Sequence, residues 1–184
     1  MQKDIQKSIA SVWYVILGFI GFILTWTLNS EKIKTISDPE YVPRCELGEG
    51  TLFSCKTVMF SSQASIFGIP NMYFGIAGFL ILIIFGITLY FSNSFNQNIS
   101  KIIEYLLLIG MITALSFSIW LAIQSALVIG SLCLYCIGIW IVSILSFSLS
   151  LSRVFSLKWF HMMVLSSTII IIFLTIVILG LTIR

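Results

Sequence analysis

Charged residues, histidine and proline are scarce in this chain. Asp, Glu, Lys and Arg make up 9% of its 184 residues, and there are one histidine and three prolines. A typical soluble domain is about 25% charged, so this composition excludes an ordinary soluble protein and predicts an integral membrane protein. The formal net charge of +3 is too small and too scattered to indicate nucleic-acid binding. Clusters of Asp, Glu and His suited to a metal ion are also missing from the sequence.

The uncharged stretches predict the membrane spans. No Asp, Glu, Lys or Arg occurs at positions 8–30, 57–100, 105–152 or 159–183. A helical span needs roughly 20 apolar residues, and a backbone in lipid must satisfy its own hydrogen bonds, so helices are expected instead of strands. We predict an all-α integral membrane protein, one domain over residues 1–184, with five transmembrane helices at about 9–29, 69–91, 102–127, 132–151 and 160–182.

The first apolar stretch follows Lys3 and Lys7, as in a signal peptide. It runs from Ile9 to Leu28, which is too long for a typical signal-peptide core, and no small-x-small cleavage pattern follows closely. We therefore interpret it as a retained span. The next segment, residues 30–68, is polar in its first half and more apolar from Ser54 to Phe67. Ser54 is a favourable N-cap, so we expect a short interfacial helix there.

The four cysteines form two pairs, Cys45 with Cys55 and Cys133 with Cys136. The first pair lies in the loop at 30–68 and the second begins the fourth predicted span, so counting spans puts all four at one membrane face. A Cys-x-x-Cys pair at a helix start is reactive, because the partial positive charge of the helix N-terminus favours a thiolate. The pattern predicts a thiol–disulfide enzyme in which a mobile loop pair exchanges with a pair fixed at the membrane.

The spacings leave one main alternative open, a non-catalytic membrane protein with two structural disulfides. Redox lability separates the two readings, since structural disulfides resist reduction. One Cys-x-x-Cys pair, with nine residues between the other two cysteines, fits a zinc site poorly. A covalent haem would need a histidine where Ile137 stands.

The cysteine motifs and their surroundings resemble the bacterial homologues of vitamin K epoxide reductase (VKOR). The resemblance rests on Cys45, on Cys55-Lys56-Thr57-Val58-Met59-Phe60-Ser61-Ser62, on Phe67-Gly68-Ile69-Pro70 and Gly75, and on Cys133-Leu134-Tyr135-Cys136. It covers about residues 12–151, and the cysteine order differs from that of the DsbB-type oxidases. It implies a four-helix bundle around a quinone site, a fifth helix, and a short half-helix in the first outer loop as a lid.

The resemblance also implies an electron route. Cys45 would take electrons from a reduced partner, and Cys45 and Cys55 would pass them on through a transient Cys55–Cys133 disulfide. Cys136 would then deliver them to a quinone, ubiquinone or menaquinone. Many bacterial relatives carry a fused thioredoxin-like domain after the fifth span. Because this chain stops at Arg184, we expect a separate thioredoxin-like (DsbA-like) periplasmic partner.

Location and quinone contacts follow from the same resemblance. It implies a bacterial inner membrane protein with a cytoplasmic N-terminus and an outward cysteine face. The numbers of Lys and Arg on the two sides are equal, so the positive-inside rule does not decide this orientation. Ser61 matches a family serine near a quinone oxygen. Ala64 and Trp140 replace an asparagine and a tyrosine of the animal enzymes, which favours a plain quinone over vitamin K epoxide. Residue type alone adds further candidates for the quinone pocket. Gln124 is polar within a span and either lines the pocket or bonds another helix, and Phe67 and Tyr135 either stack on the quinone ring or serve in packing and as interface anchors.

Two other residues attract attention as isolated polar groups. His161, the only histidine, is expected at the inner membrane surface with an interfacial role. Glu104 is expected in the first turn of the third span, where a carboxylate interacts favourably with the helix dipole.

Overall fold

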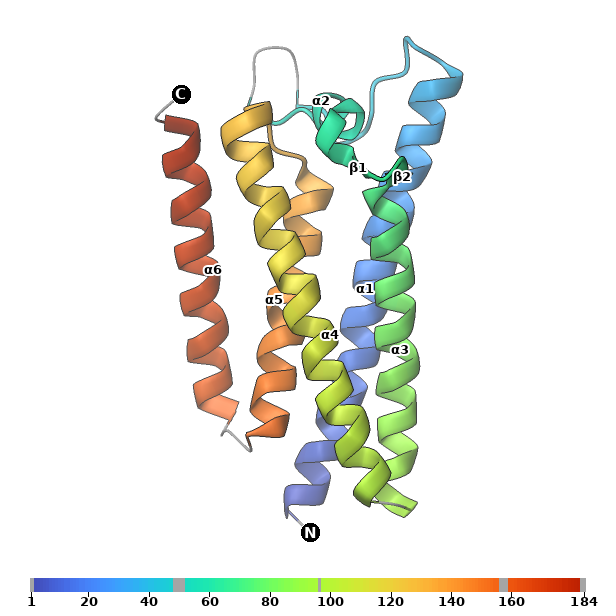
Figure 1. The fold of residues 1–184 in the computed structure, drawn as a ribbon, viewed down its shortest axis with the longest axis vertical. Helices are drawn as coiled ribbons and strands as arrows, with labels where there is room; N and C mark the ends of the chain where they lie inside the picture. Colours follow the sequence, from blue (N-terminus) through green and yellow to red (C-terminus); the bar gives the residue numbers. More distant parts are fainter. Residues whose placement is uncertain (1, 48–51, 96, 156–158, 183–184) are drawn as a thin grey trace.

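The computed structural model describes residues 2–47, 52–95, 97–155 and 159–182, and this part is dominated by long helices that run up and down (Figure 1). Four helices contain stretches long and apolar enough to cross a membrane. They are α1 (Gln2–Ser37), α3 (Asn71–Phe95), α4 (Gln97–Ile123, continued by the π-helical turn η2 at Gln124–Ile129) and α5 (Leu134–Val154). The prediction of an all-α membrane protein is confirmed.

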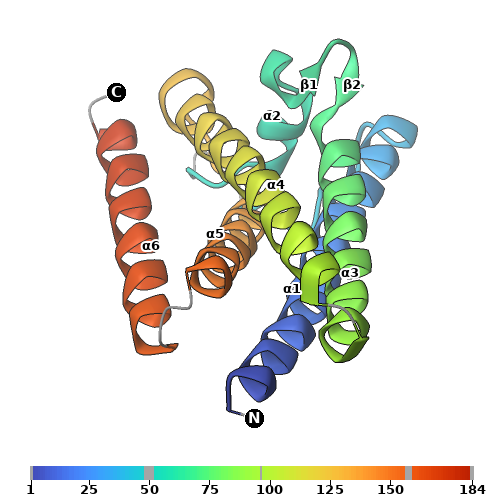
Figure 2. The same ribbon diagram turned by 60° about the horizontal axis from the view of Figure 1, so that its bottom comes forward.

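The last helix, α6 (Trp159–Thr182), has a shorter described apolar stretch, Ser166–Leu179. It lies at the edge of the molecule beside α5 and away from α1 and α3 (Figures 1 and 2). Trp140 of α5 and Phe173 of α6 join the two helices, with ring centroids 5.4 Å apart. Five membrane crossings therefore stay a prediction. The side chain of His161 lies outside the described part of the chain.

Helices α1 and α3 pack closely because glycines let their backbones approach. A Cβ atom added at Gly18 would lie 2.6 Å from Ile83 Cγ1, and one at Gly86 would lie 3.1 Å from the backbone N of Val15. Small residues at such crossings are the usual way for membrane helices to gain van der Waals contact. The core beside this crossing includes Tyr14 from α1.

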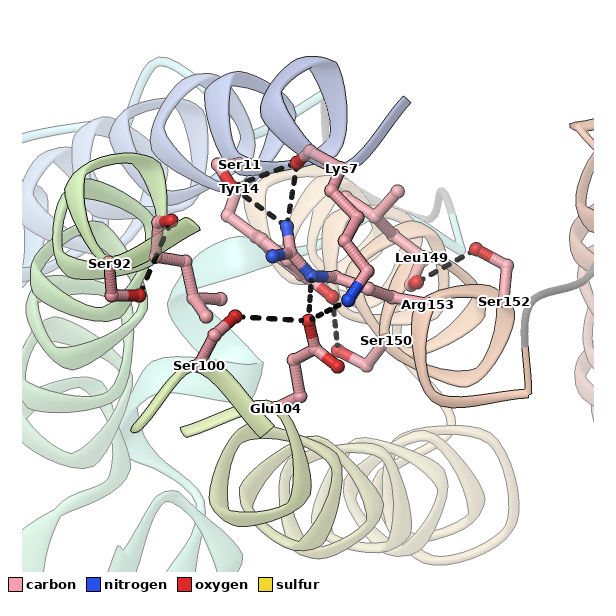
Figure 3. A network of polar contacts seen from close by, with 11 residues as sticks. Lys7, Ser11, Tyr14, Ser92, Ser100, Glu104, Leu149, Ser150, Ser152 and Arg153 are labelled. Carbon is pink, nitrogen blue, oxygen red and sulfur yellow. Dashed lines mark hydrogen bonds and ion pairs between the residues drawn. The ribbon is translucent and has the colours of Figure 1, made fainter. Parts of the chain in front are cut away.

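Polar side chains join three helices at the end of the bundle that holds the N-terminus (Figure 3). Arg153 Nε of α5 donates to Glu104 Oε1 of α4 at 3.0 Å, and Arg153 Nη1 donates to Ser11 Oγ of α1 at 2.7 Å. Lys7 Nζ lies 3.5 Å from the same Glu104 oxygen. The expected first-turn position of Glu104 is wrong, because α4 begins at Gln97, five residues before the predicted start of the span at residue 102. Its carboxylate balances Arg153 instead of the helix dipole.

The segment between α1 and α3 is more structured than the sequence suggests. Residues 30–37, expected to lie outside the first span, continue α1, which ends before Asp38-Pro39. The expected short helix is α2 (Cys55–Phe60), and Ser54 Oγ accepts its capping hydrogen bond from the Thr57 N–H. A 3-10 turn η1 (Ser62–Ala64) and a hairpin of β1 (Ser65–Ile66) and β2 (Ile69–Pro70) follow. Residues 48–51, which include Gly48 and Gly50, lie outside the described part.

The hairpin went unpredicted because its turn lacks the usual residues. Phe67 and Gly68 link the strands with φ values of +51° and +80°. A two-residue hairpin turn with positive φ at both positions is of type I′ and is normally made by Asn-Gly or Asp-Gly. A phenylalanine is an uncommon residue in that conformation.

Candidate active site

Cys45 and Cys55 form a disulfide at the end of the bundle opposite the Arg153 network. Cys55 is the first residue of α2, so its position follows from the Ser54 cap. Cys45 lies in the loop after α1. Both side chains are buried, with 3% of Cys45 and none of Cys55 exposed.

Glu31 attaches the Cys45 loop to α1. Its carboxylate Oε2 accepts hydrogen bonds from the Tyr41 hydroxyl at 2.8 Å and from the Arg44 backbone N–H at 3.0 Å. Lys34 Nζ lies 3.6 Å from its other oxygen. The hydrogen bond to the carboxylate stabilises the neutral phenol and raises the pKa of Tyr41. One carboxylate thus holds the residue next to Cys45.

The second half of the loop is attached to the start of α5. The Leu132 N–H donates to Leu52 O at 2.8 Å, and Phe53 and Leu132 form a parallel bridge. These contacts come directly before Cys55 on one segment and Cys133 on the other, so the backbone pairing brings the two cysteines together.

The sulfur atoms of Cys55 and Cys133 are 3.1 Å apart. Cys133 is a free, fully buried thiol at the N-cap of α5. The neighbouring Cys136 side chain, with the N–H groups of Cys136 and Tyr135, favours the thiolate and holds the pKa of the Cys133 thiol below its usual range. A thiolate in contact with a disulfide sulfur has the arrangement that thiol–disulfide exchange requires.

Cys136 lies one turn further into α5 and lines a cavity of about 730 Å³. The cavity also takes in α3, α4 and the segment from α2 to the hairpin. Five residues named from the sequence are among those that line it: Ser61, Ala64, Phe67, Gln124 and Trp140. Tyr135 is not among them and instead packs against the cysteine cluster. The Ser61 hydroxyl donates to Val58 O at 2.9 Å, so it would have to rotate to reach a ligand.

Most of the cavity wall was missed from the sequence, because apolar residues of different spans look alike there. Gly78 of α3 and Gly110 of α4 line it, and a Cβ atom at either position would meet no atom within 4 Å. Ser143 and Ser146 of α5 also line it. Their polarity within a span was a usable signal, since such side chains face the bundle interior. Gln124 begins the π-helical turn, a feature frequent at functional sites.

Comparison with known proteins decides the family. The sequence profile described as the vitamin K epoxide reductase family matches residues 12–151, which includes all four cysteines. The chain belongs to this family. No curated protein matches the chain significantly. VKOR proteins are membrane oxidoreductases, so this VKOR homologue is a membrane redox enzyme with a disulfide between its loop cysteines.

Proposed function

We propose that this VKOR homologue makes disulfide bonds by moving electron pairs from a thioredoxin-like protein to a membrane quinone. The observation that carries the proposal is the 3.1 Å contact between the sulfurs of Cys55 and Cys133. Cys136, one turn further into α5, lines the large apolar cavity. The contact joins the two cysteine pairs into one route. The net reaction converts a partner dithiol and a quinone into a partner disulfide and a quinol, so electrons and protons balance.

The exchange steps follow from the cysteine positions. Attack by the partner thiolate on Cys45 releases Cys55, and the partner's second thiol then frees Cys45 and leaves the partner oxidised. Cys55 attacks the Cys133–Cys136 disulfide at Cys133, and Cys45 resolves the Cys55–Cys133 bond. The loop disulfide is then restored and both helix cysteines are thiols, which is the redox state of the structure. The quinone supplies a two-electron acceptor for these thiols.

The closed loop bears on the first step. Because Cys45 is only 3% exposed, a protein thiolate reaches it only when the loop moves away from α1 and α2. The Glu31 hydrogen bonds therefore oppose partner attack, and the open loop is the reactive form.

The pocket residues favour a plain quinone. Ala64 and Trp140 both line the cavity. Ala64 has no hydrogen-bonding group where the animal enzymes have an asparagine, and the Trp140 indole can donate a hydrogen bond but cannot accept one as a tyrosine hydroxyl does. Polar groups that line the cavity include Ser61, Gln124 and Asn71. We place the protein in the bacterial inner membrane with the cysteine face outside, where disulfides persist.

Turnover of the purified protein tests the proposal. A reduced thioredoxin-like protein and a soluble quinone are mixed with it, and quinone absorbance is followed. We expect quinone loss that disappears in Cys136→Ala, while Cys45→Ala blocks oxidation of the protein partner. Full turnover by every single cysteine variant would contradict the relay. No turnover with any quinone, together with disulfides that survive mild reductant, would support a structural role.

A further inference from the structure

Three sulfur atoms from three segments of the chain converge at the active site. The Cys45, Cys55 and Cys133 sulfurs all lie within 4.8 Å of one another, and all three side chains are buried. Zinc–thiolate bonds are about 2.3 Å long, so sulfurs around one tetrahedral zinc ion are about 3.8 Å apart. In the structure the Cys45 and Cys55 sulfurs are joined in the disulfide at 2.08 Å, the Cys55 and Cys133 sulfurs are 3.1 Å apart, and no pair in the triad exceeds 4.8 Å. Once the disulfide is reduced, the Cys45 and Cys55 sulfurs move apart toward the spacing around a zinc ion, while Cys133 already lies beside Cys55.

The triad becomes available for a metal only when the Cys45–Cys55 bond is reduced. In the structure that bond is closed and Cys133 is a thiol. If Cys133 and Cys136 cannot pass on their electrons, a further partner dithiol can reduce the loop pair and leave all four cysteines as thiols. The fully reduced protein therefore exists when electrons arrive faster than an acceptor removes them.

We propose that this fully reduced form binds one thiophilic d10 cation, such as Zn²⁺, through the sulfurs of Cys45, Cys55 and Cys133. Soft thiolates select such cations. Each thiol that binds loses its proton, and no electrons are transferred. The metal is a ligand of one redox state of the enzyme and not a resident cofactor.

The surroundings of the triad favour a cation. Three unpaired thiolates buried beside Leu28, Met59 and Met72 would be costly, whereas a divalent cation neutralises two of the three charges. Binding requires deprotonation, so affinity falls as the pH is lowered.

Metal binding would stop the relay, because a coordinated thiolate no longer attacks a disulfide. This consequence rests on the proposed function, but the binding itself does not. Zinc would hold the acceptor-starved enzyme in its reduced form and protect its thiols from oxidation.

The test uses the full chain in detergent, reduced and then freed of reductant without air. Zn²⁺ is titrated in competition with a chromophoric chelator, and X-ray absorption counts the sulfur ligands. We expect one zinc per chain with three sulfurs, and no such site in the oxidised protein. Cys133→Ser should weaken binding at least about 100-fold and leave two sulfurs, whereas the matched Cys136→Ser should stay within about threefold.

Three results would overturn the proposal. The first is an unchanged zinc affinity in Cys133→Ser. The second is an equal loss of affinity in Cys133→Ser and Cys136→Ser, which would indicate a site on the Cys-x-x-Cys pair. The third is equal zinc binding to the oxidised protein, which would indicate zinc bound to surface groups. Neither a partner nor a quinone is present in this experiment. Failure of the redox proposal therefore leaves the metal-binding result interpretable.

Discussion

Replacing Glu31 by glutamine should open the Cys45 loop without disturbing the bundle. The carboxylate accepts hydrogen bonds from the Tyr41 hydroxyl and the Arg44 N–H and is 1% exposed. Hydrogen bonds to a charged group contribute about 1.5–3 kcal/mol each and neutral ones about 1 kcal/mol. Replacing the carboxylate by an amide should therefore weaken the attachment of the loop to α1 by about 1–3 kcal/mol. Since about 1.4 kcal/mol is a factor of ten, the open fraction of the loop should rise about fivefold to 150-fold.

The assay is reduction of the Cys45–Cys55 disulfide by a small dithiol. The rate is measured by mass-spectrometric counting of free thiols, and amide hydrogen exchange over residues 38–47 reports loop opening directly. We expect Glu31→Gln to accelerate both, and Tyr41→Phe to accelerate them to a comparable extent, because it removes one charged hydrogen bond completely. Thermal unfolding of the bundle should change little.

The matched control is Glu40→Gln, which neutralises an exposed carboxylate in the same loop. It should leave both rates near those of the original protein. If Glu31→Gln reacts no faster than Glu40→Gln, Glu31 does not restrain Cys45, and the argument that the closed loop opposes partner attack is refuted.

Three further outcomes are expected. Ultraviolet titration should show that Cys133 keeps its thiolate below the pH at which an ordinary thiol is protonated, because the Cys136 side chain lowers its pKa. Cys136→Ala should move this transition to higher pH, and an unmoved transition would exclude Cys136 as its cause. Arg153→Met should lower the free energy of unfolding by about 3–5 kcal/mol, because it leaves the Glu104 carboxylate buried without its main partner. Stability restored in the double variant Arg153→Met/Glu104→Gln would identify that cause. Additive losses of stability from the two substitutions would contradict it. Gly110→Leu should raise the KM for quinone, because the larger side chain fills the cavity. Reduction of the loop disulfide by a small dithiol should stay unchanged. An unaltered KM would place the quinone elsewhere.

The fold class followed from the sequence because the membrane requires it. The gaps between charged residues located the helices, and the need to satisfy backbone hydrogen bonds in lipid made them helical. Helix ends were harder to locate. Residues 30–37 are polar, which suggested the end of a span, but they continue the helix α1. The Phe67–Gly68 turn was missed because its first residue is one that turns of this type rarely use.

The candidate site was found in part. Cysteine is chemically distinctive, so its pairs were visible in the sequence, and span parity indicated that they share a face. The wall of the cavity was not visible, because lipid-facing and cavity-facing residues of an apolar helix have the same composition. Gly78 and Gly110 become informative only when the space in front of them is known.

By itself the sequence determined the membrane class, the family motifs and the four thiols, because each depends on residue type and spacing along one chain. Only the tertiary structure decided which sulfurs touch, that Glu31 holds the Cys45 loop, and that Arg153 and Glu104 form a pair across helices. The tertiary structure also brings three cysteine sulfurs together, although their spacing along the chain fits a zinc site poorly. The physical reason is common to all of these, since contacts between distant segments depend on how the helices pack and not on any local pattern.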